Sequence, residues 1–274
     1  MNRLLLVAAL LALSAPAFAQ PSSFEQRWQT KVAEWRQENA RLDPHVRHVA
    51  LFGSSSTEGW KNSRRVERFL PEIASRVINR GISGDGIGVE KRTGLYHRLE
   101  SVVAAKPSHV FVLNGRNSLG YGVPKVAERY REVLRELRRQ LPEAVICVIT
   151  CAPVRGKYAH LAAGTRDLNE RLRAIAKEEG CWLIDLYPHL VDDQGLMRSE
   201  LTKDGLHFGD EGYRILGRGI QRVVRQSEEQ QRQAAEKKAA EEKAAAEEKA
   251  GQGAGAGRQA CPASKQGLRQ RLTK

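Results

Sequence analysis

Hydrophobic and polar positions along the chain follow two alternating periods, one typical of buried strands and one typical of amphipathic helices. Short apolar runs predict five strands, at residues 45–53, 76–82, 109–113, 144–151 and 181–186. Apolar residues that recur every three or four positions predict helices between and after them, at residues 67–74, 89–104, 123–140, 165–179 and 212–225. Strands that alternate with helices predict a parallel sheet covered by helices on both faces.

The two ends of the chain depart from this alternation. Near the N-terminus, Phe24, Trp28, Val32 and Trp35 recur at helical spacing, which predicts a helix packed on the surface of the main domain. After about residue 226 the sequence is mainly alanine and alternating charge. We expect a disordered tail there, with a solvated single helix supported by i,i+4 ion pairs as the alternative. The glycines of GQGAGAG should break any such helix.

The first residues have the pattern of a cleavable export signal. Arg3 precedes an apolar run at residues 4–13, and Ala17-Phe18-Ala19 gives the small-x-small pattern of a cleavage site after Ala19. The run is too short to span a bilayer. We therefore expect a periplasmic or secreted protein without a transmembrane span. It would consist of a signal peptide (1–19), an N-terminal helical segment (20–44), the main domain (45–226) and the tail (227–274).

Composition adds a possible partner. A hydrophobic content of 41% and four tryptophans are sufficient for a core, and the formal net charge is +13. A positive field attracts anionic partners, so the basic tail is a candidate for attachment to an anionic surface, with solubility alone as the other interpretation. We expect no nucleic-acid partner, and the sequence does not indicate the oligomeric state.

The four cysteines form no evident disulfide framework. Cys147 and Cys151 lie four residues apart in one predicted strand, about 13 Å from each other, which is too far for one disulfide or one shared metal. We interpret them as small core residues. Cys181 could pair with one of them, and Cys261 in the tail could form an intermolecular bond or stay free. No metal site is visible, and we expect no metal or other cofactor.

Serine and histidine side chains that could perform nucleophilic catalysis follow predicted strands. Ser55 lies directly after the first strand, where the amides of a following helix would favour negative charge. Asp204 and His207 lie three residues apart in DGLHFGDEGY, so one short turn can present an imidazole to a serine and a carboxylate to that imidazole. Taken singly, each pattern is also typical of a helix cap. The chain order Ser, Asp, His is compatible with a catalytic triad.

Two further segments could supply donors to an oxyanion. The glycine-rich loop NRGISGDGIG follows the second strand, and its glycines would let main-chain N–H groups approach a ligand closely. Asn117, in LNGRNSLG after the third strand, could donate from its side-chain amide. Because ligands of such sheets bind at the carboxyl ends of the strands, these segments should lie at one edge.

These four segments together resemble the four blocks of the SGNH (GDSL-type) hydrolase family. The first block commonly reads G-D-S-I-T-E-G-W, and GSSSTEGW ending at Trp60 aligns Ser55 with the nucleophile. Gly84 in ISGD matches the glycine of the second block, and Asn117 in GRNS matches the asparagine of the third. Asp204 and His207 match the D-x-x-H of the last block. The resemblance covers roughly residues 49–213.

This resemblance implies a three-layer α/β/α, flavodoxin-like domain with a five-stranded parallel sheet, and ester hydrolysis without a metal. It also implies an oxyanion hole formed by the main-chain amides of Ser55 and Gly84 and the side chain of Asn117. Two positions depart from the family pattern. Ser54 replaces the usual aspartate beside the nucleophile, and Ser118 replaces the aspartate after the asparagine, which affects how Asn117 is held.

The sequence leaves the substrate open. We expect an exported serine esterase that removes acetyl or other short acyl groups from a carbohydrate through an acyl-enzyme. A lipase or lysophospholipase is one alternative, and a catalytically silent module that binds the cell envelope is another. Arg116, beside the predicted oxyanion hole, is a candidate contact for an acidic substrate, and Trp60 is a second candidate substrate contact.

Overall fold

A parallel sheet forms the centre of the molecule in a computed structural model that describes residues 22–89 and 92–256. Its five strands lie in the order β2-β1-β3-β4-β5. Their bounds are Val49–Gly53 (β1), Val77–Gly81 (β2), His109–Leu113 (β3), Val145–Ile149 (β4) and Trp182–Ile184 (β5). The predicted α/β architecture with five parallel strands is therefore confirmed, although each strand except β3 is shorter than its apolar run. The flanking residues of those runs form loops at the sheet edges.

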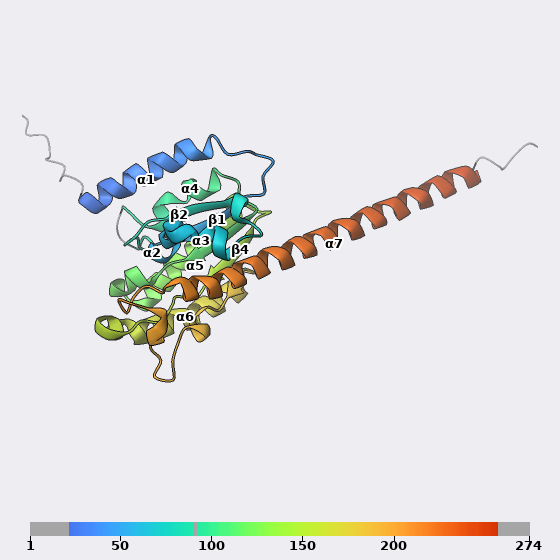
Figure 1. Ribbon diagram of the computed structural model, residues 1–274. Coiled ribbons are helices and arrows are strands. Elements are labelled where there is room, and N and C mark those ends of the chain that lie inside the picture. The colour runs from blue at the N-terminus through green and yellow to red at the C-terminus, as the bar shows by residue number, and fades with distance from the viewer. Residues whose placement is uncertain (1–21, 90–91, 257–274) are drawn as a thin grey trace, which may run out of the picture. The chain divides into compact units, whose positions relative to one another are not determined.

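Helices cover the sheet (Figure 1). Their bounds are Ser23–Asn39 (α1), Ser55–Glu58 (α2), Arg65–Phe69 (α3), Glu100–Val103 (α4), Val123–Gln140 (α5), Ala162–Glu178 (α6) and Asp210–Ala256 (α7). Short 3-10 segments lie at Gly59–Arg64, Ala74–Arg76, Leu95–Arg98, Arg116–Tyr121, Gly156–Leu161, Tyr187–His189 and Ser199–Leu201. The helix predicted at residues 89–104 is reduced to short turns ending in α4, because a glycine at residue 94 with φ of 117° interrupts it.

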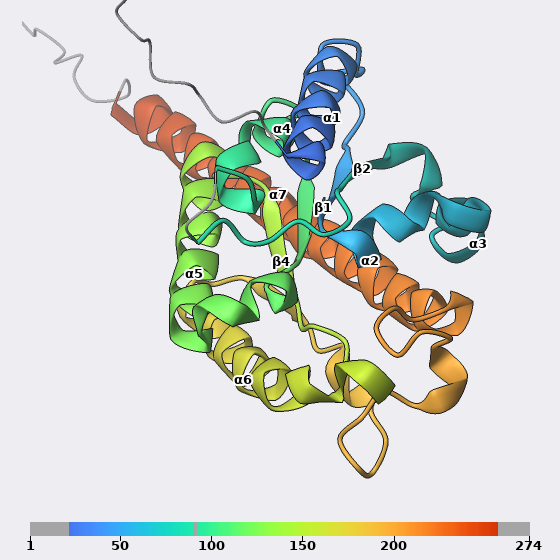
Figure 2. The same ribbon diagram turned by 90° about the vertical axis from the view of Figure 1, so that its left-hand side faces the viewer.

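Alternate side chains of the strands face opposite layers of helix. Phe52, Val112 and Val148 belong to a core cluster that includes residues of α4, α5 and α6. On the other face, the first turns of α7 approach α3 and β5, since Cβ atoms added at Gly217 and Gly219 would contact Phe69 and Ile184. Burying one apolar face of each helix against the sheet produces the three-layer α/β/α arrangement (Figure 2).

Helix α1 lies beside α4, near the β2 edge of the sheet (Figure 2). The predicted aromatic stripe of this helix is confirmed, because Trp28 and Trp35 are buried with Ile82, and Phe24 and Val32 pack against them. Arg27 donates to the Ser83 carbonyl at 2.7 Å, which fastens the helix to the loop after β2. This helix therefore reaches the loop that carries Gly84.

The last helix continues far beyond its predicted end. From Val224 onward the chain forms a second compact unit, and α7 runs through Ala256 without a break at the predicted glycine-rich segment. Glycine weakens a helix by about 1 kcal/mol per residue but, unlike proline, does not remove its hydrogen bonds. Ion pairs at i,i+4 spacing support the polar part, as between Lys237 and Glu241. Of the disordered tail and the single helix that the sequence left open, the described residues up to Ala256 form the helix.

Some sequence-based predictions are limited by the described ranges. The predicted signal peptide and Cys261 lie outside them. Cys147, Cys151 and Cys181 are all free thiols, so no disulfide links these three. Across residues 22–89 and 92–256, no helix is long and apolar enough to cross a membrane.

Three strands end level with one another at the edge where the predicted site residues follow. Gly53 of β1 pairs with Gly81 of β2 on one side and with Leu113 of β3 on the other. The chain leaves β1 for β2 on one side and then continues to β3 on the other, so the carboxyl end of β1 is a topological switch point. Ligand sites of open α/β sheets lie at such points.

Candidate active site

Ser55, His207 and Asp204 form a hydrogen-bonded chain at this switch point. Ser55 is the first residue of α2, directly after β1. Its Oγ lies 3.0 Å from Nε2 of His207, and Nδ1 of His207 lies 2.7 Å from Oδ2 of Asp204. These are the contacts through which an imidazole accepts a proton from a serine while a carboxylate fixes its tautomer. The fold thus brings together residues 152 positions apart in the chain.

The carboxylate of Asp204 is held in its charged form. Partial burial acts to raise its pKa, but hydrogen bonds from the main-chain and side-chain N–H groups of His207 and from the Leu206 N–H outweigh this effect. The pKa of Asp204 is therefore well below its usual value. Its Oδ1 accepts both main-chain bonds at 2.8 Å, so Oδ2 is left to the imidazole.

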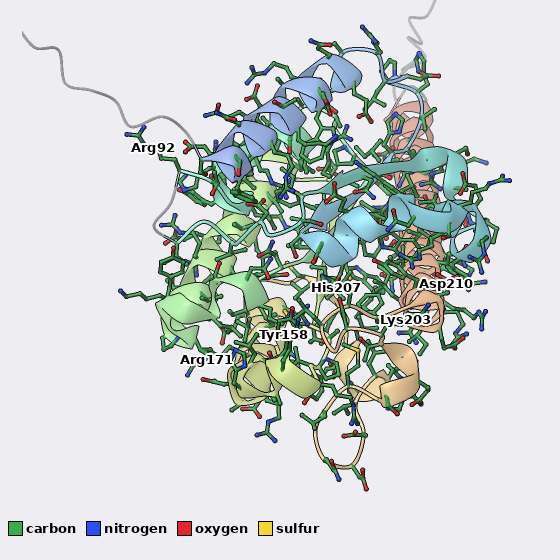
Figure 3. All side chains as sticks on the ribbon, turned by 60° about the vertical axis from the view of Figure 1, so that its left-hand side comes forward. Arg92, Tyr158, Arg171, Lys203, His207 and Asp210 are labelled. Carbon is green, nitrogen blue, oxygen red and sulfur yellow. The ribbon has the colours of Figure 1, made fainter. Side chains whose placement is uncertain are left out.

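The loop that carries Asp204 and His207 leads into α7 at Asp210 (Figure 3). Inside the loop, Thr202 Oγ1 donates to the His207 carbonyl at 2.8 Å and accepts from the Gly205 N–H at 2.9 Å. The main chain of Arg155 lies against Gly205. The main-chain N–H of Arg155 donates to the Gly205 carbonyl at 2.7 Å, and a Cβ atom at Gly205 would lie 2.3 Å from the Arg155 carbonyl oxygen. Only glycine permits this close approach.

The Gly84 loop is held from beneath and from the side. Gly84 has φ of 83°, a left-handed conformation that favours glycine, and it is exposed. The preceding Ser83 N–H donates to the carboxylate of Glu58 in α2 at 2.8 Å. Below the loop, the fully buried Asp85 and Arg98 form an ion pair at 2.7 Å. Arg98 also donates to the carbonyl of Gly53 at 2.7 Å, so one guanidinium joins this loop to the end of β1.

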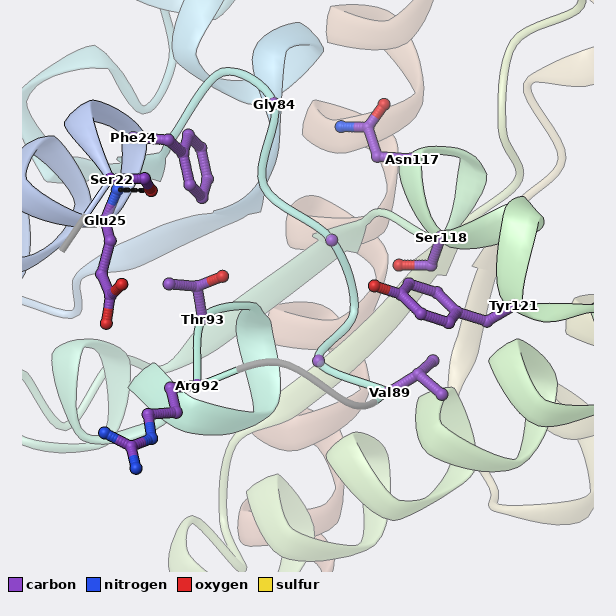
Figure 4. A pocket seen from close by; sticks show the side chains of 12 residues that line it. Ser22, Phe24, Glu25, Gly84, Val89, Arg92, Thr93, Asn117, Ser118 and Tyr121 are labelled. Carbon is purple, nitrogen blue, oxygen red and sulfur yellow. Dashed lines mark hydrogen bonds between the residues drawn. The ribbon is translucent and has the colours of Figure 1, made fainter. Parts of the chain in front are cut away.

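Asn117 lies across from Gly84, in the 3-10 turn after β3 (Figure 4). Its Nδ2 donates to the Asp85 carbonyl at 2.9 Å. A primary amide has two N–H donors, so this bond orients the group while the second N–H remains for a ligand. Ser118, which departs from the family pattern, is buried and accepts the Ile87 N–H at 3.0 Å. The serine therefore joins the third block to the loop of the second.

Arg116 and Trp60, the two predicted substrate contacts, lie in different surroundings. The guanidinium of Arg116 donates to the carbonyls of Ala152 at 3.0 Å and Leu206 at 3.2 Å, and burial lowers its pKa. Its charge faces main-chain oxygens inside the protein. The side chain of Trp60 is 2% exposed and packs edge-to-face on Tyr213. The predicted substrate contact of Trp60 is therefore corrected to a packing role. Arg116 lines a small pocket together with Ser54, Ser56 and Asn117, so its predicted contact with an acidic substrate stays a prediction.

Two clefts border the site, together with a small pocket lined by Ser54, Ser56, Arg116 and Asn117. One, of about 480 Å³, is lined by Gly84, Asn117, residues at the start of α1 and Tyr121. The other, of about 590 Å³, borders Asp204 and His207. In the described part of the chain, no group of three or more His, Cys, Asp or Glu side chains is arranged to hold a metal ion.

Several residues that support the site were missed from the sequence. Glu58 belongs to the motif that suggested Ser55, but its carboxylate accepts a hydrogen bond from the Ser83 N–H. No local pattern in the sequence reveals this bond. The buried pair of Asp85 and Arg98 joins two segments 13 residues apart. Phe24 was found only as part of a docking stripe. Glu58 and Asp85 lie in motifs, and Phe24 lies in the helical stripe, so the sequence marked these positions. Their contact partners are set by tertiary packing.

The fold and the hydrogen-bonded serine, histidine and aspartate define this protein as an α/β protein with a hydrolase-type site at the carboxyl edge of a parallel sheet. Residues 51–215 match the model of the GDSL-like lipase/acylhydrolase family. The chain belongs to this family, which confirms the resemblance seen in its four motifs. A comparison with curated protein sequences gave no significant match.

Solved structures share this fold. A GDSL-like lipase from Bacteroides thetaiotaomicron matches with a TM-score of 0.59 and 22% identity, covering 72% of this chain and 98% of the other. An acetyl xylan esterase matches with a TM-score of 0.55 and 21% identity, over 65% and 99% of the two chains. A variant of an acetyl-xylooligosaccharide esterase from Geobacillus stearothermophilus matches with a TM-score of 0.50 and 18% identity, over 65% and 95%. At these identities the similarity establishes the fold.

Proposed function

We propose that the protein is a serine carboxylic-ester hydrolase with Ser55 as nucleophile. His207 accepts the Ser55 hydroxyl proton as Oγ attacks the ester carbonyl, and Asp204 holds the imidazole in the required tautomer. The tetrahedral intermediate expels the alcohol, which takes the proton from His207. Water then attacks the acyl-enzyme with His207 again as base, releasing the acid and free Ser55. The observation that carries this proposal is the continuous chain of contacts from Ser55 Oγ to Asp204.

The oxyanion of each tetrahedral intermediate would be bound by three donors, the main-chain N–H groups of Ser55 and Gly84 and the side-chain amide of Asn117. Ser55 is the first residue of α2, where main-chain N–H groups have no partner within the helix. The Asp85 carbonyl fixes the Asn117 amide, and Glu58 fixes the N–H that precedes Gly84. Donors held in advance stabilise developing charge without reorganisation.

We propose acetyl or another short acyl group on a carbohydrate as the substrate. Two structural neighbours are described as acetyl xylan and acetyl-xylooligosaccharide esterases, which supports this choice. We further propose export, based on the predicted signal at residues 1–19. N-terminal sequencing of protein from the extracytoplasmic fraction should begin at Gln20.

Covalent labelling tests the nucleophile. Treatment of the mature protein with a fluorophosphonate should add one phosphonyl group to Ser55, detected by peptide mass spectrometry. Ser55→Ala should not be labelled and should not hydrolyse p-nitrophenyl acetate. The neighbouring Ser54→Ala is the matched control and should still be labelled. Absence of labelling in the wild-type protein would instead favour a silent module that binds the envelope.

Chain-length profiling separates a deacetylase from a lipase. With p-nitrophenyl esters of increasing length, kcat/KM should fall steeply beyond butyrate if short acyl groups are the substrate. A maximum at octanoate or longer would identify a lipase or lysophospholipase instead. A panel of acetylated sugars then tests the acceptor directly, by release of acetate.

A further inference from the structure

Helix α1 lies largely outside the region shared with the family, yet it forms one wall of the cleft beside Gly84 and Asn117. The family match begins at residue 51, whereas α1 spans Ser23–Asn39. Phe24 lines the cleft together with both residues of the proposed oxyanion hole. A Cβ atom added at Gly84 would lie 3.4 Å from Cε2 of Phe24, so the ring lies beside this loop with little room between them. An element outside the matched family region thus borders the two proposed oxyanion donors Gly84 and Asn117.

The position of α1 is fixed by several contacts. Arg27 donates to the Ser83 carbonyl at 2.7 Å, one residue before Gly84. Trp28 and Trp35 are buried against Ile82. Near the other end of the helix, Arg80 donates to the Asn39 side chain at 2.6 Å. Buried aromatics and long-range hydrogen bonds hold the helix, so Phe24 is presented to the cleft by a rigid element.

The cleft combines two aromatic walls with polar groups. Figure 4 shows Phe24 on one side and Tyr121 on the other, with Thr93 below Phe24 and Arg92 farther below, its side chain pointing outward. Glu25 also lines the cleft, and its main-chain N–H is occupied by Ser22 Oγ at 3.2 Å, which caps the helix. The lining is half polar and half apolar. A polyhydroxylated ring suits it, since its C–H faces can pack on aromatic rings while its hydroxyls bond to charged and amide groups.

We propose that this cleft is a glycosyl subsite, in which Phe24 and Tyr121 hold a sugar unit next to the esterified one. This inference rests on the proposed esterase function and adds to it where the acceptor binds. Ser55 and His207 are not part of the cleft lining, so the cleft is separate from the place of the acyl group itself. A volume of about 480 Å³ lies within the range of about 300–1,000 Å³ that small-molecule sites occupy. An oligosaccharide is long enough to fill it while its ester is at Ser55.

The proposal is tested by comparing two ester substrates in the mature protein. For each variant, kcat/KM for acetylated xylo-oligosaccharides is divided by kcat/KM for p-nitrophenyl acetate. Phe24→Ala and Tyr121→Ala should each lower this ratio by about tenfold, because one lost packing contact of about 1.4 kcal/mol corresponds to that factor. The loss should arise mainly in KM and should increase from the disaccharide to the tetrasaccharide.

Val32→Ala is the matched control on the same helix, because Val32 packs α1 against the domain but does not line the cleft. It should leave the ratio unchanged. An equal loss in Val32→Ala, or no loss in either aromatic variant, would overturn the subsite. So would a loss in Phe24→Ala confined to p-nitrophenyl octanoate relative to the acetate, since this would identify an acyl-chain pocket.

Binding without turnover separates this inference from the proposed function. Calorimetric titration of Ser55→Ala with unacetylated xylotetraose should show binding, and adding Phe24→Ala should weaken it by about tenfold. Failure of Ser55 labelling would contradict the esterase while this titration could still support the sugar site. Labelling of Ser55 together with no xylotetraose binding would retain the esterase and reject the subsite.

Discussion

The side-chain amide of Asn117 donates to the main-chain carbonyl of Asp85 at 2.9 Å and so joins the turn after β3 to the loop after β2. The same loop carries Gly84, and Ser118 binds it a second time through the Ile87 N–H. The two proposed oxyanion donors outside α2 are therefore held as one unit. Because the site departs from the family pattern at Ser118, this arrangement shows how a serine hydroxyl can join the two loops.

Asn117→Ala should reduce kcat for p-nitrophenyl acetate by about 10²–10³, the usual effect of removing one oxyanion donor. The variant should fold normally, since Asn117 is exposed and only one hydrogen bond is lost. Asn117→Asp has nearly the same shape but cannot donate when ionised, so it should be at least as impaired. Steady-state kinetics and circular dichroism measure both effects, and an active Asn117→Asp would rule out the donor role.

Arg116→Lys should lower kcat by about tenfold or more, because a misplacement of about 1 Å in the catalytic loop is sufficient for such losses. A single ammonium group cannot reach both the Ala152 and Leu206 carbonyls that the guanidinium joins. KM for p-nitrophenyl acetate should change little. If Arg116 instead bound substrate, KM would rise with kcat unchanged. Arg171→Lys, an exposed arginine on α6 paired with Asp167, is the control and should behave like the wild-type protein.

Arg98→Met should destabilise the protein by about 3–5 kcal/mol, since it leaves the buried Asp85 carboxylate without its partner. Burial already raises the pKa of Asp85. Replacing both residues in Asp85→Asn/Arg98→Met should recover part of this loss, because no charge then remains to be buried unpaired. Chemical denaturation of the three variants measures the coupling. Additive losses in the double variant would show that the two side chains act independently.

Tyr213 should make the stability fall at alkaline pH. Burial raises its pKa to about 12, and its hydroxyl donates to the Ser56 carbonyl at 2.9 Å. Below pH 10 the tyrosine is protonated in both states and gives no pH dependence. Between about pH 10 and 12 it ionises only in the unfolded chain, so the free energy of unfolding falls by about 1.4 kcal/mol per pH unit.

Tyr213→Phe isolates this contribution. The variant should lose about 1 kcal/mol at neutral pH with the hydrogen bond to Ser56. The difference between wild-type and variant should shrink as the pH rises above 10 and should reverse before about pH 12, because only the wild-type protein loses stability there. Urea denaturation at several pH values provides the measurement. A difference that stays constant up to pH 12 would mean that the hydroxyl is not protected from ionisation.

The sequence by itself determined the order of the strands and helices, the aromatic stripe of α1 and the four segments that supply Ser55, Gly84, Asn117 and the pair of Asp204 and His207. These features are local: periodicity records which side of an element is buried, three of the motifs follow strands, and the last one precedes α7. The parallel arrangement follows from the alternation alone, and it explains why the motifs meet at one sheet edge.

Tertiary structure decided which partners these side chains contact. Arg116 looked accessible in its motif, but the carbonyls of Ala152 and Leu206 come from segments 36 and 90 residues away. Trp60 is likewise buried by Tyr213. Phe24 reaches Gly84 only because Arg27 and the two tryptophans fix α1 on the loop after β2. Partners distant in the chain leave no periodic trace in the sequence, so the contacts that orient the site are set only when the elements pack.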